Sequence, residues 1–78
     1  MLIQVLGTGC VKCQKTAEAV AQAARELGVD VEIEKVTSIE RIIAAGVMAT
    51  PALIVDGRLR VAGRAPSLDE AKKILAAD

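Results

Sequence analysis

The sequence predicts a small α/β domain in which helices pack on a mixed sheet. An apolar run at residues 2–6 leads into a long segment with helical spacing, and a second apolar run at residues 52–55 leads into the turn Asp56-Gly57. Two Ser/Thr-x-x-Glu boxes each precede a further helical pattern. With 78 residues the chain makes one domain, residues 1–78, and a domain of this size buries only about 60% of its unfolded surface.

The first half of the chain is predicted to be strand, helix and strand. Residues 2–6 are apolar nearly throughout, as expected of a strand that is buried on both faces. The segment GTG at 7–9 ends this strand, and a helix follows from residue 10 or 11 to 27, with Gly28 as its C-terminal stop. Residues 29–34 alternate polar and apolar side chains, which indicates a strand with one exposed face near a sheet edge. Such a unit is parallel and right-handed.

A short helix is predicted next. The capping box of Thr37 with Glu40 would start it, and Gly46 would end it. Its apolar side would carry Ile39, Ile42 and Ile43.

The last part of the chain predicts a hairpin and a closing helix. Asp56-Gly57 is a strong hairpin-turn signal between residues 52–55 and 58–61. The capping box of Ser67 with Glu70 starts the final helix. The predicted order of elements is therefore β-α-β-α-β-β-α.

The composition excludes several functions. The chain has no aromatic residue on which nucleobases could stack, and its ten Lys and Arg balance ten Asp and Glu, so no net field attracts nucleic acid or an anionic membrane. It has no histidine, the commonest general base and metal ligand. No stretch approaches the about 18 apolar residues of a membrane span, and no signal peptide is visible. We expect a cytoplasmic protein that binds neither nucleic acid nor membrane, with chemistry that rests on thiols, carboxylates or amines.

The only two cysteines, Cys10 and Cys13, lie in the stretch GTGCVKC at the predicted strand-to-helix junction. Unpaired N–H groups and the helix dipole favour a thiolate there, and Lys12 adds a cation that would lower the thiol pKa further. Cys13 lies three residues on, on the same helix face, so the geometry suits attack by Cys10 and resolution by Cys13. A structural staple is disfavoured because the loop is tiny and cytosolic disulfides are rare.

Two other interpretations of the cysteine pair stay open. The thiols could pack as small hydrophobic groups, or they could form a soft-metal binding or delivery module for Cu(I) or zinc. A tetrahedral site would need two more ligands, and the chain has neither histidine nor a third cysteine. The redox interpretation is favoured because CxxC in a cytosolic βαβ context is a redox signature.

A Thr50-Pro51 step comes directly before the apolar run at 52–55. Proline is tolerated at the first position of a strand, where it costs no ladder hydrogen bond. From the residues alone the preceding bond is expected to be trans.

These features together resemble the thioredoxin/glutaredoxin superfamily: CxxC after the first strand, Thr-Pro before an apolar hairpin, and a closing helix. The stretch GTGCVKC looks like the subgroup of minimal redox-active disulfide proteins of bacteria and archaea, and with ATPALIVDG the resemblance extends from Leu2 to Ala76. It implies the thioredoxin-like fold, with a four-stranded mixed sheet in the order 2-1-3-4 and helices on both faces.

The resemblance also implies roles for individual residues. Cys10 would be the nucleophile and Cys13 the resolving thiol. Thr50-Pro51 would form a cis bond opposite the cysteines, where the backbone of Thr50 pairs with an extended substrate, and Gly63 would lie beside the substrate groove. The implied activity is that of a thiol-disulfide oxidoreductase of the electron-carrier type. It would act on protein disulfides as a monomer, with a thioredoxin-reductase-like electron donor and no bound cofactor or metal.

Two of the places where the chain departs from the family patterns are the dipeptide between the cysteines and the position six residues before Cys10. The dipeptide between the cysteines is Val11-Lys12 rather than Gly-Pro or Pro-Tyr, so the reduction potential does not carry over. Six residues before Cys10, where thioredoxins keep a buried acid, the chain has Gln4.

Two groups of residues outside the motifs are interpreted as structural or solubilising. Met48 is predicted to fill a gap in the core, with contact to a partner as the alternative. Arg58, Arg60 and Arg64 are interpreted as a solubilising basic strip.

Overall fold

The described residues, 1–7 and 11–77, fold in a computed structural model into four strands and three helices. In chain order these are β1 (Leu2–Leu6), α1 (Val11–Leu27), β2 (Glu32–Val36), α2 (Ile39–Ala44), β3 (Ala52–Val55), β4 (Arg58–Ala62) and α3 (Leu68–Ala77). The strands form one mixed sheet in the order β2-β1-β3-β4. The predicted order of elements and the strand order implied by the family resemblance are both confirmed.

Strand β1 lies inside the sheet and pairs on both sides. It runs parallel to β2 from Leu2 opposite Glu32, and antiparallel to β3 from Ile3 opposite Val55. Both of its neighbours use its backbone hydrogen-bonding groups. Ile3 and Val5 are buried on one face, whereas on the other face Leu6 is buried and Leu2 is 39% exposed, so the predicted burial of both faces is met only in part.

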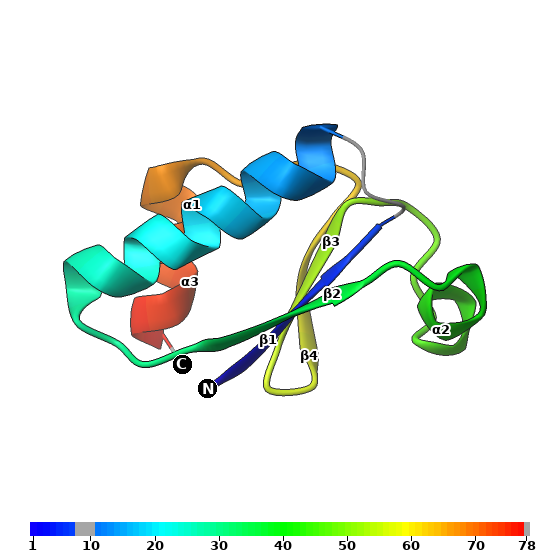
Figure 1. Cartoon of the computed structure of the whole chain (residues 1–78), viewed down its shortest axis with the longest axis horizontal. Coiled ribbons are helices and arrows are strands. Elements are labelled where there is room, and N and C mark those ends of the chain that lie inside the picture. Colours follow the sequence, from blue (N-terminus) through cyan, green and yellow to red (C-terminus); the bar gives the residue numbers. More distant parts are fainter. Residues whose placement is uncertain (8–10, 78) are drawn as a thin grey trace.

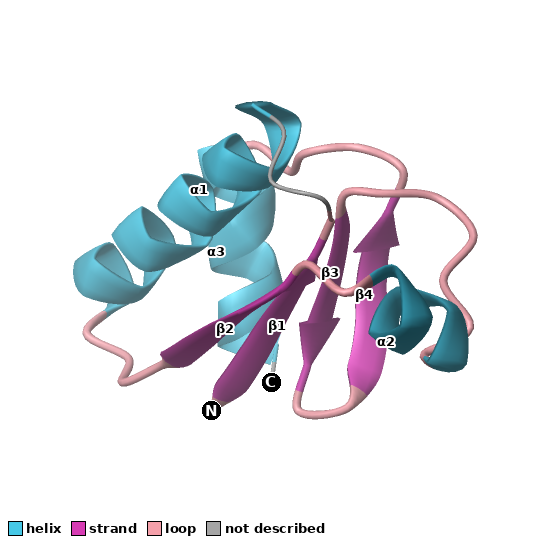
Figure 2. Ribbon diagram, turned by 45° about the vertical axis from the view of Figure 1, so that its right-hand side comes forward, coloured by secondary structure: helices cyan, strands magenta, loops and turns pink. Residues whose placement is uncertain are grey.

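The helices cover both faces of the sheet (Figures 1 and 2). Helices α1 and α3 lie side by side on one face and enclose the larger core, whose fully buried members include Ile3, Val20, Leu53 and Val55. Helix α2 lies at the other face, over a smaller cluster made of Leu6, Val36, Ile42, Val47, Ala52 and Ile54. No helix among the described residues is long and apolar enough to cross a bilayer.

Strand β2 begins later than predicted. The alternation placed it at residues 29–34, whereas it spans Glu32–Val36. Its bounds follow from pairing with β1, because the N–H of Glu32 donates to the carbonyl of Met1 at 2.9 Å and Val36 lies opposite Leu6. The prediction of an edge strand with an exposed face is confirmed.

Helix α2 begins differently from the prediction. Its N-cap is Ser38 rather than Thr37, and the Ser38 hydroxyl accepts from the N–H of Arg41 at 3.4 Å. Of its isoleucines only Ile42 is buried, while Ile39 and Ile43 are 62% and 67% exposed. A helix of six residues has fewer than two turns and can turn only a narrow stripe toward the sheet.

Helix α3 begins at the predicted cap, Ser67, but the Glu70 side chain pairs with Arg64 instead of completing the capping box. The hydroxyl of Ser67 accepts from the N–H of Glu70 at 3.2 Å, as a cap requires. The Glu70 carboxylate does not complete the predicted box. Both of its oxygens instead accept from the Arg64 guanidinium, which lowers the pKa of Glu70. Arg64 therefore ties the segment before α3 to its first turn.

Replacing the α3 cap should destabilise the fold. Ser67→Ala removes the acceptor for the N–H of Glu70, so we expect the free energy of unfolding to fall by about 1 kcal/mol. Urea denaturation followed by far-ultraviolet circular dichroism measures this without an aromatic reporter. Ser67→Asp is the matched control, since it keeps a capping acceptor and should stay close to the unchanged protein. Equal losses in both variants would contradict the capping role.

Acid should weaken the fold through three carboxylates near the surface, of which Glu34 and Glu70 are half-buried. The pKa is lowered for Glu70 by Arg64, for Glu26 by Lys72, and for Glu34 by Gln4. Each lowered pKa adds stability that is present above the ordinary value of 4.5 and is lost as the pH falls through the folded-state value.

The contribution of Arg64 to this acid sensitivity can be measured directly. Arg64→Met should narrow the difference in urea midpoint between about pH 7 and about pH 3. Arg58→Met, which removes an exposed cation from β4, should leave that difference nearly unchanged. If both variants behave alike, the Arg64–Glu70 pair does not set the pH dependence.

Candidate functional site

The CxxC motif spans the junction of β1 and α1. The predicted nucleophile Cys10 lies outside the described residues. Cys13 is the third residue of α1 and is 7% exposed. Its backbone N–H belongs to the first helical turn, whose N–H groups have no partner within the helix. That turn contains no acidic residue and does contain the exposed Lys12, so its charge and dipole both favour a negative sulfur.

The sulfur of Cys13 packs against Gly7, the residue that follows β1. A Cβ built on Gly7 would overlap Cys13 Sγ, and it would lie 3.4 Å from Cys13 Cβ and 3.9 Å from Thr50 Cβ. The end of β1, the first turn of α1 and the loop before β3 therefore meet at one point. The structure brings together Cys13 and Thr50, two of the residues that the sequence singled out.

The remaining predicted binding residues lie next to Thr50. The Thr50–Pro51 peptide bond is cis, as the family resemblance implies, and not the trans isomer that X-Pro frequencies favour. Pro51 is buried, and its carbonyl accepts from the N–H of Gly63 at 2.9 Å. Gly63 has a φ of +84°, and a Cβ there would lie 3.3 Å from Ala49 Cβ. Only glycine suits this close approach of the β4 end to the loop before β3.

A small pocket of about 100 Å³ lies beside Cys13. Its lining consists of Val5, Gly7, Cys13, Gln14, Lys35 and Thr37. None of Gln14, Lys35 and Thr37 was predicted to be a site residue. Gln14 directly follows Cys13 in α1, whereas Lys35 and Thr37 come close to the motif through the pairing of β1 with β2, in which Val5 lies opposite Lys35. The nearly buried sulfur is therefore bordered by polar groups as well as by apolar ones.

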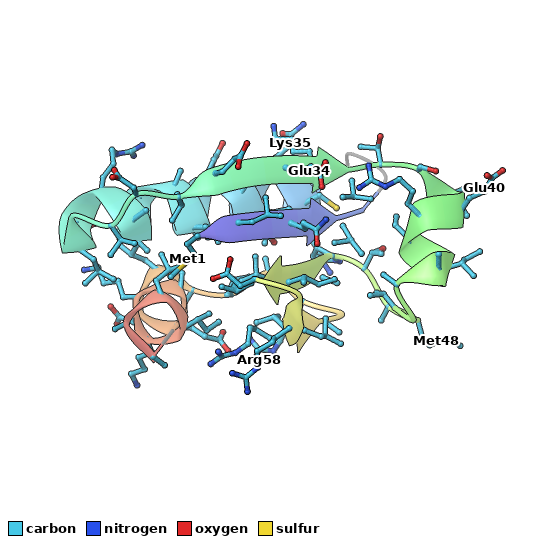
Figure 3. The ribbon with its side chains drawn as sticks, turned by 90° about the horizontal axis from the view of Figure 1, so that it is seen from below. Met1, Glu34, Lys35, Glu40, Met48 and Arg58 are labelled. Carbon is cyan, nitrogen blue, oxygen red and sulfur yellow. The ribbon has the colours of Figure 1, made fainter. Side chains whose placement is uncertain are left out.

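Gln4 belongs to a separate polar cluster. Its amide donates to Glu34 Oε1 at 2.9 Å, and Arg41 of α2 donates to the same oxygen at 3.2 Å. These contacts lower the pKa of Glu34, with the hydrogen bond from Gln4 as the largest cause. Glu34 and Lys35 are neighbours on β2 (Figure 3). Gln4 is not among the residues that line the pocket beside Cys13.

Met48 does not fill a gap in the core, so that prediction was wrong. Its side chain is 98% exposed and projects away from the rest of the chain (Figure 3). The neighbouring Val47 occupies the place in the smaller core instead. Met48 lies two residues before Thr50, so it is available for contact with another molecule.

Metal ligands are few in this chain. The sequence has no histidine. Within residues 1–7 and 11–77, no three or more Cys, Asp or Glu side chains gather where they could hold a metal ion.

Comparison with known proteins identifies the family. A family model for the thioredoxin domain matches residues 1–76. A thioredoxin of Methanothermobacter thermautotrophicus is 47% identical over 75 residues, which cover 96% of this chain and 97% of that protein. A thioredoxin of Methanocaldococcus jannaschii is 43% identical over 75 residues, 96% of this chain and 86% of that protein. The chain therefore belongs to the thioredoxin domain family, whose members are thiol-disulfide oxidoreductases.

Proposed function

We propose that this chain is a cytosolic electron carrier that reduces disulfides in partner proteins through Cys10 and Cys13. The observation that carries the proposal is the position of the Cys13 sulfur. The sulfur lies in the first turn of α1, against the end of β1. Cys13 and Thr50 are both neighbours of Gly7. A thiol at a helix N-terminus beside an exposed loop is suited to thiol-disulfide exchange.

The reaction proceeds in two exchange steps. The thiolate of Cys10 attacks one sulfur of a partner disulfide, which forms a mixed disulfide and releases the other partner sulfur as a thiolate. The thiolate of Cys13 then attacks the Cys10 sulfur, forms the Cys10–Cys13 disulfide and releases the second partner thiolate. Two electrons and two protons pass from the dithiol to the partner, which ends with two thiols.

The loop before β3 is the proposed docking site for the substrate. Thr50 is exposed beside the motif, so its backbone is available to an extended segment of the partner. Gly63 borders this loop through its hydrogen bond to Pro51, and without a side chain it leaves room for a substrate backbone. Lys12, in the first turn of α1, and Met48, in this loop, are both exposed and would contact the partner.

A reductase of the thioredoxin-reductase type would return the two electrons to the Cys10–Cys13 disulfide. The chain itself would need no bound cofactor for either exchange step. A cytosolic location accords with a CxxC pair that cycles rather than staples the fold, since reductants keep most thiols reduced there. We expect the carrier to act as a monomer.

The alternative, a soft-metal module, fits the fold less well. Small heavy-metal-associated domains also place CxxC after their first strand, but they follow the order β-α-β-β-α-β and finish on a strand. This chain has a second α-helix between β2 and β3 and finishes on α3. The family assignment supports the redox function as well.

Trapping the mixed disulfide would test the proposed roles of the two cysteines. Cys13→Ser removes the resolving thiol, so after mixing with a disulfide-bonded protein such as insulin it should accumulate a covalent complex through Cys10. Cys10→Ser should form little or none. Acid-quenched samples analysed by intact mass measure both results.

A parallel reaction with the wild-type protein tests the metal hypothesis. The reduced wild-type protein should reduce the substrate equally well before and after treatment with a strong Cu(I) and zinc chelator. Activity that depends on the metal, or a complex that forms through Cys13 alone, would contradict the proposal.

A further inference from the structure

Gly7 is the one glycine among the described residues that a positive φ does not account for. Among residues 1–7 and 11–77, Gly28, Gly46, Gly57 and Gly63 have positive φ values, and Gly7 does not. Its N–H donates to the carbonyl of Val36 at 2.9 Å, which extends the pairing of β1 with β2 by one residue. Its φ therefore does not call for glycine, and the reason for a glycine is sought in the space around it.

That space is filled by the sulfur of Cys13. A Cβ on Gly7 would overlap Cys13 Sγ, whereas its distances to Cys13 Cβ and Thr50 Cβ, 3.4 and 3.9 Å, are ordinary contacts. Gly7 is buried and Cys13 is nearly so, which leaves the sulfur little freedom to move aside. The obstacle to a side chain at position 7 is therefore a single atom.

We propose that Gly7 is a positioning residue for the resolving step, because the Cys13 sulfur occupies the space that a side chain at position 7 would fill. The inference rests on the proposed function, in which Cys13 attacks the Cys10 sulfur of the mixed disulfide. That attack requires the incoming sulfur to approach in line with the bond that breaks, and misplacement by about 1 Å can slow such a step by about a hundredfold. A methyl group at position 7 would displace the sulfur by changing its rotamer or by moving the start of α1.

The kinetic test separates the two exchange steps. A nitrobenzoate disulfide releases one coloured thiolate when Cys10 forms the mixed disulfide and a second when Cys13 resolves it. In single-turnover stopped flow, Gly7→Ala should leave the first phase within about twofold of wild type and slow the second by about tenfold or more. Gly46→Ala is the control, because its Cβ would meet no neighbour within 4 Å and it acts only through its positive φ.

A stability measurement tests the cause. In the presence of reductant, Gly7→Ala should lower the urea midpoint in the wild-type background, and most of this loss should disappear in a Cys13→Ala background, where the sulfur is absent. If the Gly7→Ala protein folds only when Cys13→Ala is also present, that result likewise supports the claim that the Cys13 sulfur excludes a side chain from position 7. If neither form folds, the obstacle is not the sulfur and the proposal is wrong.

The remaining outcomes also decide the question. A second phase as fast as wild type in Gly7→Ala, or equal slowing in Gly46→Ala, would overturn the positioning role. A wild-type protein that releases one coloured thiolate and never the second would instead overturn the proposed function of Cys13. In that case the paired stability measurement would still show whether the sulfur is what excludes a side chain from position 7.

Discussion

The pairing of β1 on both of its edges is the constraint on which the rest of the structure depends. A strand that is hydrogen-bonded to both β2 and β3 can add no further strand, so its register fixes the positions of both neighbours. Ile3 and Val5 project into the larger core, and Leu6 into the smaller one. Without aromatic side chains, the chain depends on burying many aliphatic side chains, each of which stabilises the fold by roughly 1.5–3 kcal/mol when fully buried. Gln4 is the polar exception, and its side-chain amide donates a hydrogen bond to Glu34.

The position of the functional site follows from this central strand. Since β1 is paired up to its last residue and Gly7 continues the pairing, the chain leaves the sheet at a fixed point. The first turn of α1 lies over that point, and the loop before β3 reaches it because β3 runs antiparallel to β1. The sheet thus brings Cys13 and Thr50 together, although 36 residues lie between them in the sequence.

Much of this arrangement could be predicted from local patterns. The apolar run of β1, the Asp56-Gly57 turn and the Ser67 cap are signals carried by adjacent residues, and the structure contains all three. The features that could not be predicted depend on partners distant in sequence. The bounds of β2 are set by register with β1. A single sequence shows no difference between the buried Val47 and the exposed Met48.

The functional site likewise has features that local sequence patterns reveal and others that depend on residues distant in sequence. CxxC and Thr-Pro are visible in the sequence and suggest a thiol chemistry. The sequence also shows a glycine directly after the first strand, but not that Gly7 faces the Cys13 sulfur, because that contact depends on how α1 packs on β1. Lys35 likewise borders the small pocket beside Cys13 because β2 pairs with β1.

A thiol–disulfide titration of the wild-type protein tests the central claim most directly. The protein is equilibrated in dithiothreitol buffers of graded potential, the thiols are alkylated, and the adducts are counted by intact mass, since the chain has no aromatic fluorophore. We expect one cooperative two-thiol transition between about −200 and −300 mV, the range of thioredoxin- and glutaredoxin-like couples. Two thiols that never form an intramolecular disulfide, or that a bound metal protects from alkylation, would contradict it.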